Sequence, residues 1–96
     1  MIKIPGLNAT ELNIVQECFD ANISVKLFGS RVVGNFRPNS DLDICILSDL
    51  NRAEVSKLAE KFEESNLPFT VDIVLYKDCS GDFKKIIDNT GVSLYS

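Results

Sequence analysis

A stretch of strict alternation in the middle of the chain constrains its fold more than any other feature. Between residues 41 and 47 every second side chain is aliphatic, so the segment predicts a β-strand with one wholly apolar face. That face consists of Leu42, Ile44 and Ile46, and the opposite face of Asp41, Asp43, Cys45 and Leu47. An apolar face must be covered by another element, so the strand is predicted to belong to a sheet that packs against helices.

Helical and extended patterns follow one another along the rest of the chain. An apolar stripe at helical spacing predicts a helix over 51–66, which Pro68 prevents from continuing, and β-branched and aromatic residues predict a strand over 69–76. The other predicted elements are a helix from Asn8 or Thr10 to about Ala21, a strand over 23–28, a helical turn over 31–34, a loop over 35–40, a helix over 82–89 and an edge strand over 92–95. For 96 residues, this order predicts one domain, residues 1–96, of the α/β (α+β) class, with helices flanking a small sheet.

Charge and composition narrow the classes of function. Lys and Arg number 10 against 14 Asp and Glu, a net charge of −4, so the chain lacks the basic surplus that attracts nucleic acid. It contains no His, which excludes zinc–histidine sites and Ser-His-Asp triads. A bound nucleotide therefore has to be held by a local device such as a metal ion.

The cysteines predict a reduced, cytoplasmic protein. Cys18, Cys45 and Cys79 form no CxxC pair, and the first two fall among apolar residues of a predicted helix and strand. We interpret these two as core residues rather than metal ligands. No segment has the roughly 20 apolar residues of a membrane span, so no membrane association is expected.

Carboxylates on two predicted strands are the candidate chemical groups. Asp41 and Asp43 point to the same face, about 6.5–7 Å apart along the strand, so their oxygens can converge on hard cations such as Mg²⁺. Taken alone, this pair is more typical of a solvated edge strand. Asp72, among the β-branched residues of the 69–76 strand, is costly if buried without a partner. It is plausible at a metal site, although an exposed strand acid fits the pattern equally well.

The dipeptide Gly29-Ser30, at the end of the 23–28 strand, predicts a phosphate contact. Glycine lets the backbone approach a phosphate, the serine hydroxyl can donate to it, and a helix start behind it would add backbone N–H groups. An isolated Gly-Ser is more often a plain strand–helix turn. Gly-Ser followed at this fixed spacing by Asp-x-Asp, however, arises by chance only on the order of once in a thousand such chains.

These residues carry a resemblance to a known family. The stretch from Leu27 to Ile44 resembles the signature of minimal nucleotidyltransferases in the DNA polymerase beta superfamily, and the segment 71–74 resembles their third-carboxylate strand. The resemblance implies their small mixed sheet flanked by helices. This chain differs from the signature at Val33, where similar proteins carry a second basic residue.

The resemblance also implies roles for individual residues. Gly29, Ser30 and Arg31 would bind the nucleotide, an NTP such as ATP. Asp41 and Asp43 would ligate two Mg²⁺ ions, and Asp72 would complete the metal site beside the acceptor hydroxyl and help to deprotonate it.

Many members of this family are antitoxins that adenylylate a tyrosine of a HEPN ribonuclease toxin. A chain with no room for its own acceptor-binding domain fits a protein acceptor, and its acidic balance disfavours a nucleic acid. Phe36, Val92 and Leu94 are candidates for a docking surface, although ordinary core roles fit them equally well. Two other functions stay open, a non-catalytic antitoxin-like binding module and a transferase for a small hydroxylated substrate with a partner chain. A homo-oligomer is also compatible with the sequence.

Overall fold

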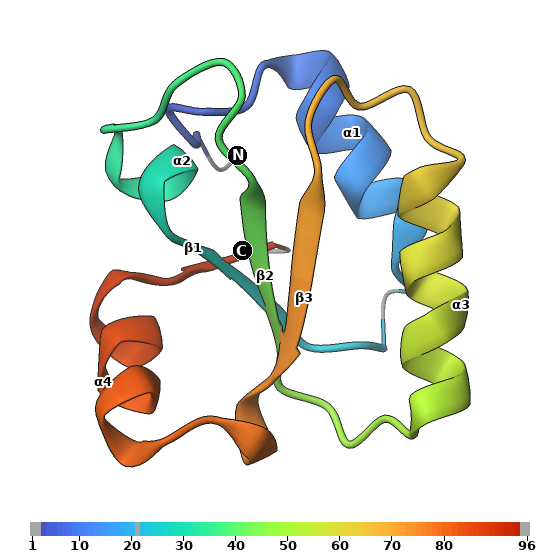
Figure 1. Ribbon diagram of the computed structural model, residues 1–96, viewed down its shortest axis with the longest axis vertical. Helices are drawn as coiled ribbons and strands as arrows, with labels where there is room; N and C mark the ends of the chain where they lie inside the picture. The colour runs from blue at the N-terminus through green and yellow to red at the C-terminus, as the bar shows by residue number, and fades with distance from the viewer. Residues whose placement is uncertain (1–2, 21, 95–96) are drawn as a thin grey trace.

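The computed structural model describes residues 3–20 and 22–94 and contains one sheet with helices on both faces (Figure 1). The elements in chain order are α1 (Ala9–Cys18), β1 (Val25–Phe28), α2 (Ser30–Val33), β2 (Leu42–Ile46), α3 (Arg52–Glu63), β3 (Val71–Leu75), the 3₁₀ turn η1 (Tyr76–Asp78), α4 (Gly81–Thr90) and β4 (Val92–Ser93). The predicted α/β class, with a mixed sheet flanked by helices, is confirmed.

The sheet has the strand order β3-β2-β1-β4. β1 runs antiparallel to both β2 and β4, whereas β2 and β3 are parallel. A parallel pair cannot be closed by a short hairpin and needs a crossover, which here is α3. Asp41 and Asp43, at the start of β2, therefore lie at the same end of the sheet as Asp72 near the start of β3.

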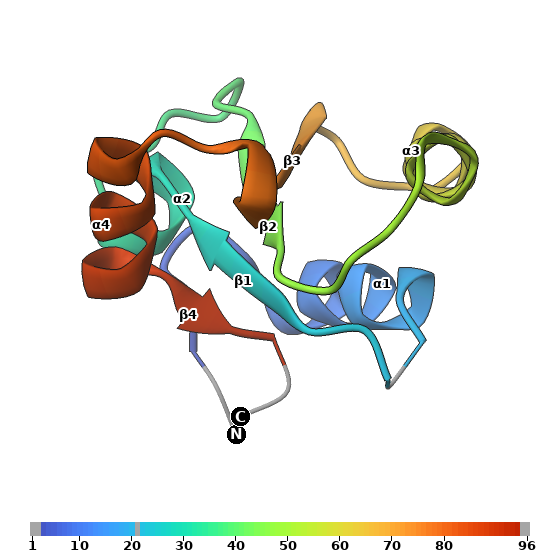
Figure 2. The same cartoon turned by 90° about the horizontal axis from the view of Figure 1, so that it is seen from below.

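Apolar layers cover both faces of the sheet, and one of them lies on the face that the alternation in β2 predicts to be apolar. Leu42, Ile44 and Ile46 are essentially fully buried in the cluster that includes residues of α1 and α3. On the opposite face, Cys45 is buried with Phe28 of β1 and with Ile87 of α4. Figure 2 shows α1 and α3 on one side of the sheet and α2 and α4 on the other.

Asparagine side chains cap the starts of α1 and α3, and a cap at Asn8 or Thr10 was predicted for the first of these helices. Asn8 rather than Thr10 caps α1, and Asn51 caps α3. In both cases the Asn side chain accepts the N–H of a Glu three residues on, and that Glu accepts the Asn N–H in return. Such a reciprocal cap satisfies two backbone donors that a helix start leaves unpaired.

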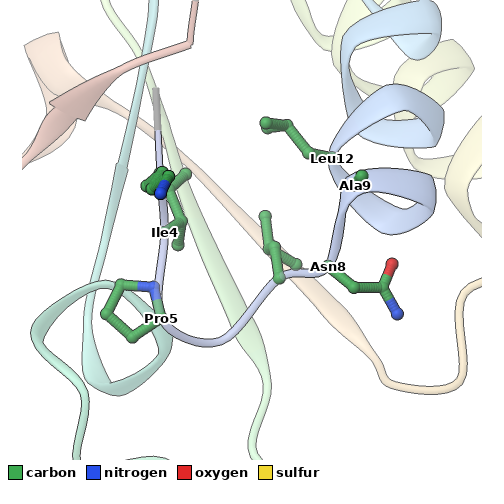
Figure 3. Close-up of a pocket in the computed structure, with 7 residues that line it drawn as sticks. Ile4, Pro5, Asn8, Ala9 and Leu12 are labelled. Carbon is green, nitrogen blue, oxygen red and sulfur yellow. The ribbon is translucent and has the colours of Figure 1, made fainter. Parts of the chain in front are cut away.

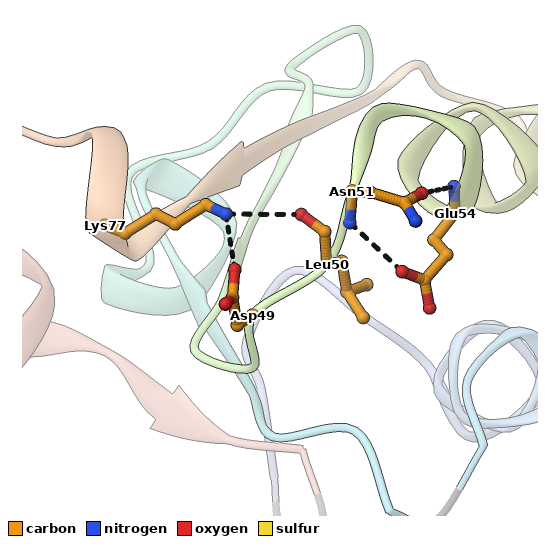
Figure 4. A network of polar contacts seen from close by, with 5 residues as sticks. All are labelled: Asp49, Leu50, Asn51, Glu54 and Lys77. Carbon is orange, nitrogen blue, oxygen red and sulfur yellow. Dashed lines mark hydrogen bonds and ion pairs between the residues drawn. The ribbon is translucent and has the colours of Figure 1, made fainter.

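A polar network fixes the end of the sheet that lies away from Asp41 (Figure 4). The capping box of Asn51 and Glu54 adjoins Lys77, which pairs with Asp49 and lies 3.4 Å from the carbonyl oxygen of Leu50. The Lys77–Asp49 pair is exposed, so it contributes little to stability. The network joins the loop after β2 to the turn after β3.

Several elements are shorter than predicted. The third predicted strand, 69–76, pairs only over Val71–Leu75, because β2 offers partners only from Leu42 to Ile46, and the chain then enters the 3₁₀ turn. α1 ends at Cys18, since Phe19 has extended dihedral angles and packs on Phe62. The predicted end of the first helix, at Ala21, and the predicted end of the last strand, at residue 95, lie outside the described residues.

The cysteines are free thiols, and Cys18 and Cys45 are buried, as the sequence predicts. Burial also raises the pKa of the Cys45 thiol to about 11. Within residues 3–20 and 22–94, no helix is long and apolar enough to cross a membrane.

Candidate active site

The register of the sheet brings two of the predicted carboxylates together. In the parallel pair of β2 and β3, Asp43 lies directly opposite Asp72. In the antiparallel pair of β1 and β2, Phe28 lies opposite Asp43. Side chains at paired positions point to the same face of the sheet, so Asp43 and Asp72 are neighbours on the face that α4 covers further along. Asp41, two residues before Asp43, belongs to the same face.

The three carboxylates differ in exposure, and they repel one another. Asp43 is partly buried, whereas Asp41 and Asp72 are exposed. Burial raises the pKa of the Asp43 carboxyl, and the negative charges of Asp72 and then Asp41 raise it further. Since each added negative charge disfavours ionisation of Asp43, the site as built favours a cation that neutralises it.

No described side chain supplies that cation. Over residues 3–20 and 22–94, the ion pair found is the one between Lys77 and Asp49, at the other end of the sheet. None of the hydrogen bonds among these residues is accepted by the carboxylates of Asp41, Asp43 or Asp72. Unpaired carboxylate oxygens are the kind of ligand that Mg²⁺ prefers, so the chemistry of these residues suits a divalent cation. Among residues 3–20 and 22–94, however, no three Asp, Glu or Cys side chains are arranged so that they could hold a metal ion together, and this includes Asp41, Asp43 and Asp72.

Gly29 lies against the carboxylate of Asp43. Its φ of 84° and ψ of −165° fall in a region that is essentially restricted to glycine. A Cβ added there would collide with Oδ2 of Asp43 and lie 3.0 Å from its Cγ. The cause is the β1–β2 register, because Gly29 follows Phe28, the partner of Asp43. Ser30, the first residue of α2, follows directly and is half-buried. The predicted phosphate-binding dipeptide and the predicted metal ligands therefore adjoin one another.

Arg31 is placed differently from the prediction. Its side chain is 4% exposed, the one buried polar or charged residue in the described part of the chain. The guanidinium donates to backbone carbonyls of Gly6 (2.7 Å), Pro38 (2.9 Å) and Ser40 (2.9 Å), with a longer contact to Arg37 (3.5 Å). These bonds occupy the guanidinium inside the protein. The predicted contact of Arg31 with a nucleotide finds no support in this geometry.

Two of the residues considered for a docking surface have core roles instead. Leu94 is fully buried and Val92 packs against the same cluster. Phe36 is half-buried, with its ring 5.3 Å from the Arg31 guanidinium carbon. The ordinary core reading of Val92 and Leu94 is therefore correct.

A hollow of about 470 Å³ is shown in Figure 3, and none of the three carboxylates lines it. It is lined by Lys3, Ile4, Pro5, Leu7, Asn8, Ala9 and Leu12. A second hollow, of about 480 Å³, borders it at Pro5, Leu7 and Asn8 and extends to Arg31 and Phe69. Neither hollow includes Asp41, Asp43, Asp72, Gly29 or Ser30, so the candidate site is not identified by concavity.

Sequence patterns did not reveal the supporting residues Gly6 and Phe69. Gly6 is buried, and a Cβ on it would lie 2.6 Å from Cα of Arg31. The ring of Phe69 lies 3.9 Å from the Arg31 guanidinium carbon. The Pro5-Gly6 dipeptide is a turn signal, but nothing local indicates what it contacts.

Comparisons with known proteins place this geometry in context. Residues 13–96 match the family model described as polymerase beta, nucleotidyltransferase. The chain is 37% identical over 86 residues to the probable protein adenylyltransferase MntA of Haemophilus influenzae, an alignment that covers 84% of this chain and 75% of that protein.

Solved structures with a similar fold come from toxin–antitoxin systems. One is a toxin–antitoxin crystal structure with AMP-PNP, 26% identical to this chain, with a TM-score of 0.66 over 88% of this chain and 69% of the other. Another is a mutant of the MntA-HpeT toxin–antitoxin pair, 26% identical, with a TM-score of 0.68 over 94% of this chain and 73% of the other.

Proposed function

Because the chain belongs to the polymerase beta nucleotidyltransferase family, as its signature predicts, we propose that it transfers AMP from ATP to a tyrosine hydroxyl of a HEPN ribonuclease toxin and so acts as an antitoxin. The similarity to a probable protein adenylyltransferase and the toxin–antitoxin pairs among similar structures support a protein acceptor. The structure with AMP-PNP supports an adenine nucleotide as donor. The observation that carries the proposal is the alignment of Asp43 with Asp72 beside Gly29.

The proposed reaction is an in-line displacement at the α-phosphorus of ATP. The tyrosine oxygen forms a bond to that phosphorus, the bond to the β-phosphate oxygen breaks, and pyrophosphate leaves. Asp72, exposed on the edge strand, is open to an approaching protein and accepts the proton of the tyrosine hydroxyl. Docking of the partner orients that hydroxyl, which an internal pocket would otherwise have to do.

The other site residues act on the phosphates and on the charge. The backbone at Gly29 has no side chain to keep phosphates away, and the hydroxyl of Ser30 donates to a phosphate oxygen. Asp41, Asp43 and Asp72 would hold Mg²⁺, and the bound ion would stabilise the attacking and leaving oxygens. Binding of that cation would also relieve the repulsion by Asp72 and Asp41, which adds to burial in raising the pKa of Asp43.

The test follows the α-phosphate of ATP. The protein is incubated with Mg²⁺, the product of the neighbouring toxin gene, and ATP labelled either at the α- or at the γ-phosphate. We expect α-label but no γ-label on the toxin, and a mass increase of one AMP on a single tyrosine. Asp72→Asn should abolish labelling, whereas Asp20→Asn, an exposed aspartate beyond α1, should not.

Other outcomes select the other functions. A toxin that is silenced by the Asp72→Asn variant without being labelled would establish the binding-module function and overturn the proposal. Label on an added small hydroxyl compound, with none on the toxin, would establish a small-molecule transferase.

A further inference from the structure

Arg31 carries a buried positive charge that the proposed transfer does not use. It belongs to the family signature, yet no carboxylate of the described residues pairs with it, and its charge is compensated by carbonyl oxygens. Burying a charge in this way is costly unless its hydrogen bonds are satisfied. A side chain with this arrangement must hold parts of the chain in a geometry that would otherwise be lost.

The carbonyls that accept from Arg31 belong to two separate segments. One is the turn at Gly6, which also donates its own N–H to the carbonyl of Arg31 at 2.7 Å. The other is the loop over residues 37–40, which ends directly before Asp41. The guanidinium thus fixes the backbone that leads into the first predicted metal ligand.

A third segment is held through an aromatic ring. The Phe69 ring lies 3.9 Å from the guanidinium carbon, within the range of a cation–π contact. Phe69 is three residues before Asp72, and its neighbour Thr70 accepts the N–H of Leu42 at 2.9 Å. Contacts therefore close a ring from Arg31 through the 37–40 loop to β2, across to the start of β3, and back to Arg31.

We propose that Arg31 is a positioning residue that sets the placement of Asp41 relative to Asp72, rather than a nucleotide ligand. This inference rests on the proposed function in one respect, because the turnover that its test measures is the proposed AMP transfer. Only a guanidinium suits the task, because its planar fork donates in several fixed directions while its face stacks on a ring. A lysine ammonium donates from one point and has no such face.

The test compares Arg31→Lys with Arg52→Lys, the same change at an exposed residue at the start of α3. For Arg31→Lys we expect kcat to fall on the order of a hundredfold, the cost of misplacing reacting groups by about 1 Å, with the KM for ATP changed less than about threefold. The Mg²⁺ concentration for half-maximal activity should rise. Arg52→Lys should match the wild type in all three.

Hydrogen exchange measured by mass spectrometry tests the geometry without turnover. In Arg31→Lys, peptides covering 35–42 and 67–72 should exchange at least about tenfold faster, while peptides of α4 should keep their wild-type rates. If Arg31→Lys does not fold, Phe69→Leu provides the same test, because it removes the stacked ring without removing the guanidinium.

The outcomes separate the two proposals. A raised KM for ATP with unchanged exchange would assign Arg31 to the nucleotide and overturn the positioning role. Faster exchange throughout the protein, with normal kcat for the folded fraction, would also overturn it, since the side chain would then serve global stability alone. An inactive wild type would refute the proposed function, whereas the exchange pattern would still decide for or against positioning.

Discussion

Replacing Gly29 by alanine tests the contact on which the candidate site depends. The change places a methyl group on a backbone with φ of 84° and ψ of −165°. The same methyl group would collide with the Asp43 carboxylate. The variant should therefore be destabilised for two separable reasons, and transfer should be lost because Asp43 has to move.

The size of the effect follows from these two terms. Backbone strain in this region costs about 1–3 kcal/mol for a residue with a side chain, and overpacking against Asp43 costs a further ~1–3 kcal/mol. Together they amount to about 2–6 kcal/mol, a large part of the roughly 5–15 kcal/mol that stabilises a domain of this kind.

Gly34 is the matched control. It also has a positive φ, 105°, but a Cβ there would meet Pro5 at 3.9 Å, an ordinary contact. Gly34→Ala should therefore show the strain alone, about 1–2 kcal/mol. A second comparison places Gly29→Ala in an Asp43→Ala background, where the carboxylate is gone and its Cβ, 3.3 Å from the added methyl, is the main remaining obstacle.

The assay is urea unfolding followed by circular dichroism, without divalent cations. We expect Gly29→Ala to cost about 1–3 kcal/mol less in the Asp43→Ala background than in the wild type, which is the coupling between neighbouring residues. A coupling free energy of zero, with equal costs at Gly29 and Gly34, would refute the contact between Gly29 and Asp43.

Four further predictions concern individual side chains. Asp41→Asn and Asp43→Asn should each reduce transfer at least about a hundredfold with an unchanged circular dichroism spectrum, since a metal ligand is lost; near-normal transfer by either would contradict the site. The raised pKa of Asp43 means that its ionisation opposes folding, so without metal Asp43→Asn should be more stable than the wild type at pH 7. The difference should shrink as the pH falls through the folded-state pKa toward 3.8, the ordinary pKa of an aspartate. A constant difference in urea unfolding from pH 7 to pH 4 would argue against it. Ser30→Ala should weaken ATP binding about ten- to a hundredfold, from the loss of a hydrogen bond worth ~1.5–3 kcal/mol, and calorimetry giving an unchanged affinity would place the phosphates elsewhere. Because the pKa of Cys45 is raised to about 11, iodoacetamide at pH 8 should label the half-buried Cys79 of the native protein well before Cys45, a ranking that peptide mapping can check.

The alternation in β2 made the two faces of the sheet predictable. A strand with one wholly apolar face has few alternatives, and Leu42, Ile44 and Ile46 are buried as this pattern requires. Asp43 could be placed on the opposite face for the same reason. The pairing of Asp43 with Asp72 could not be predicted, because strand order and register depend on contacts between segments far apart in the sequence.

The ends of the helices and strands were less predictable, because they depend on neighbouring segments of the fold. A strand continues only while a neighbour offers backbone partners, and local propensity does not reveal that neighbour's length. Tyr76 therefore suits a strand by its side chain but begins a 3₁₀ turn, since its partner strand ends at Ile46. The cap of the first helix was more predictable, because Asn8 bonds to a residue only three positions away.

Positions 31 and 33, the two places where the signature has a basic residue, have different physical roles in this chain. A phosphate and a cluster of carbonyl oxygens are both acceptors for a guanidinium, so the residue type at position 31 does not distinguish them. The distinction lies in tertiary contacts, one of which joins Arg31 to a carbonyl 25 residues away. Val33, where this chain departs from the signature described above, is 57% exposed at the end of α2. The charge that is missing at position 33 would lie on the surface, where no described contact requires it. The charge at position 31, by contrast, is present where three segments meet around it. Variation at position 33 should accordingly alter how the protein attracts phosphate, and variation at position 31 should alter the geometry of the carboxylates themselves.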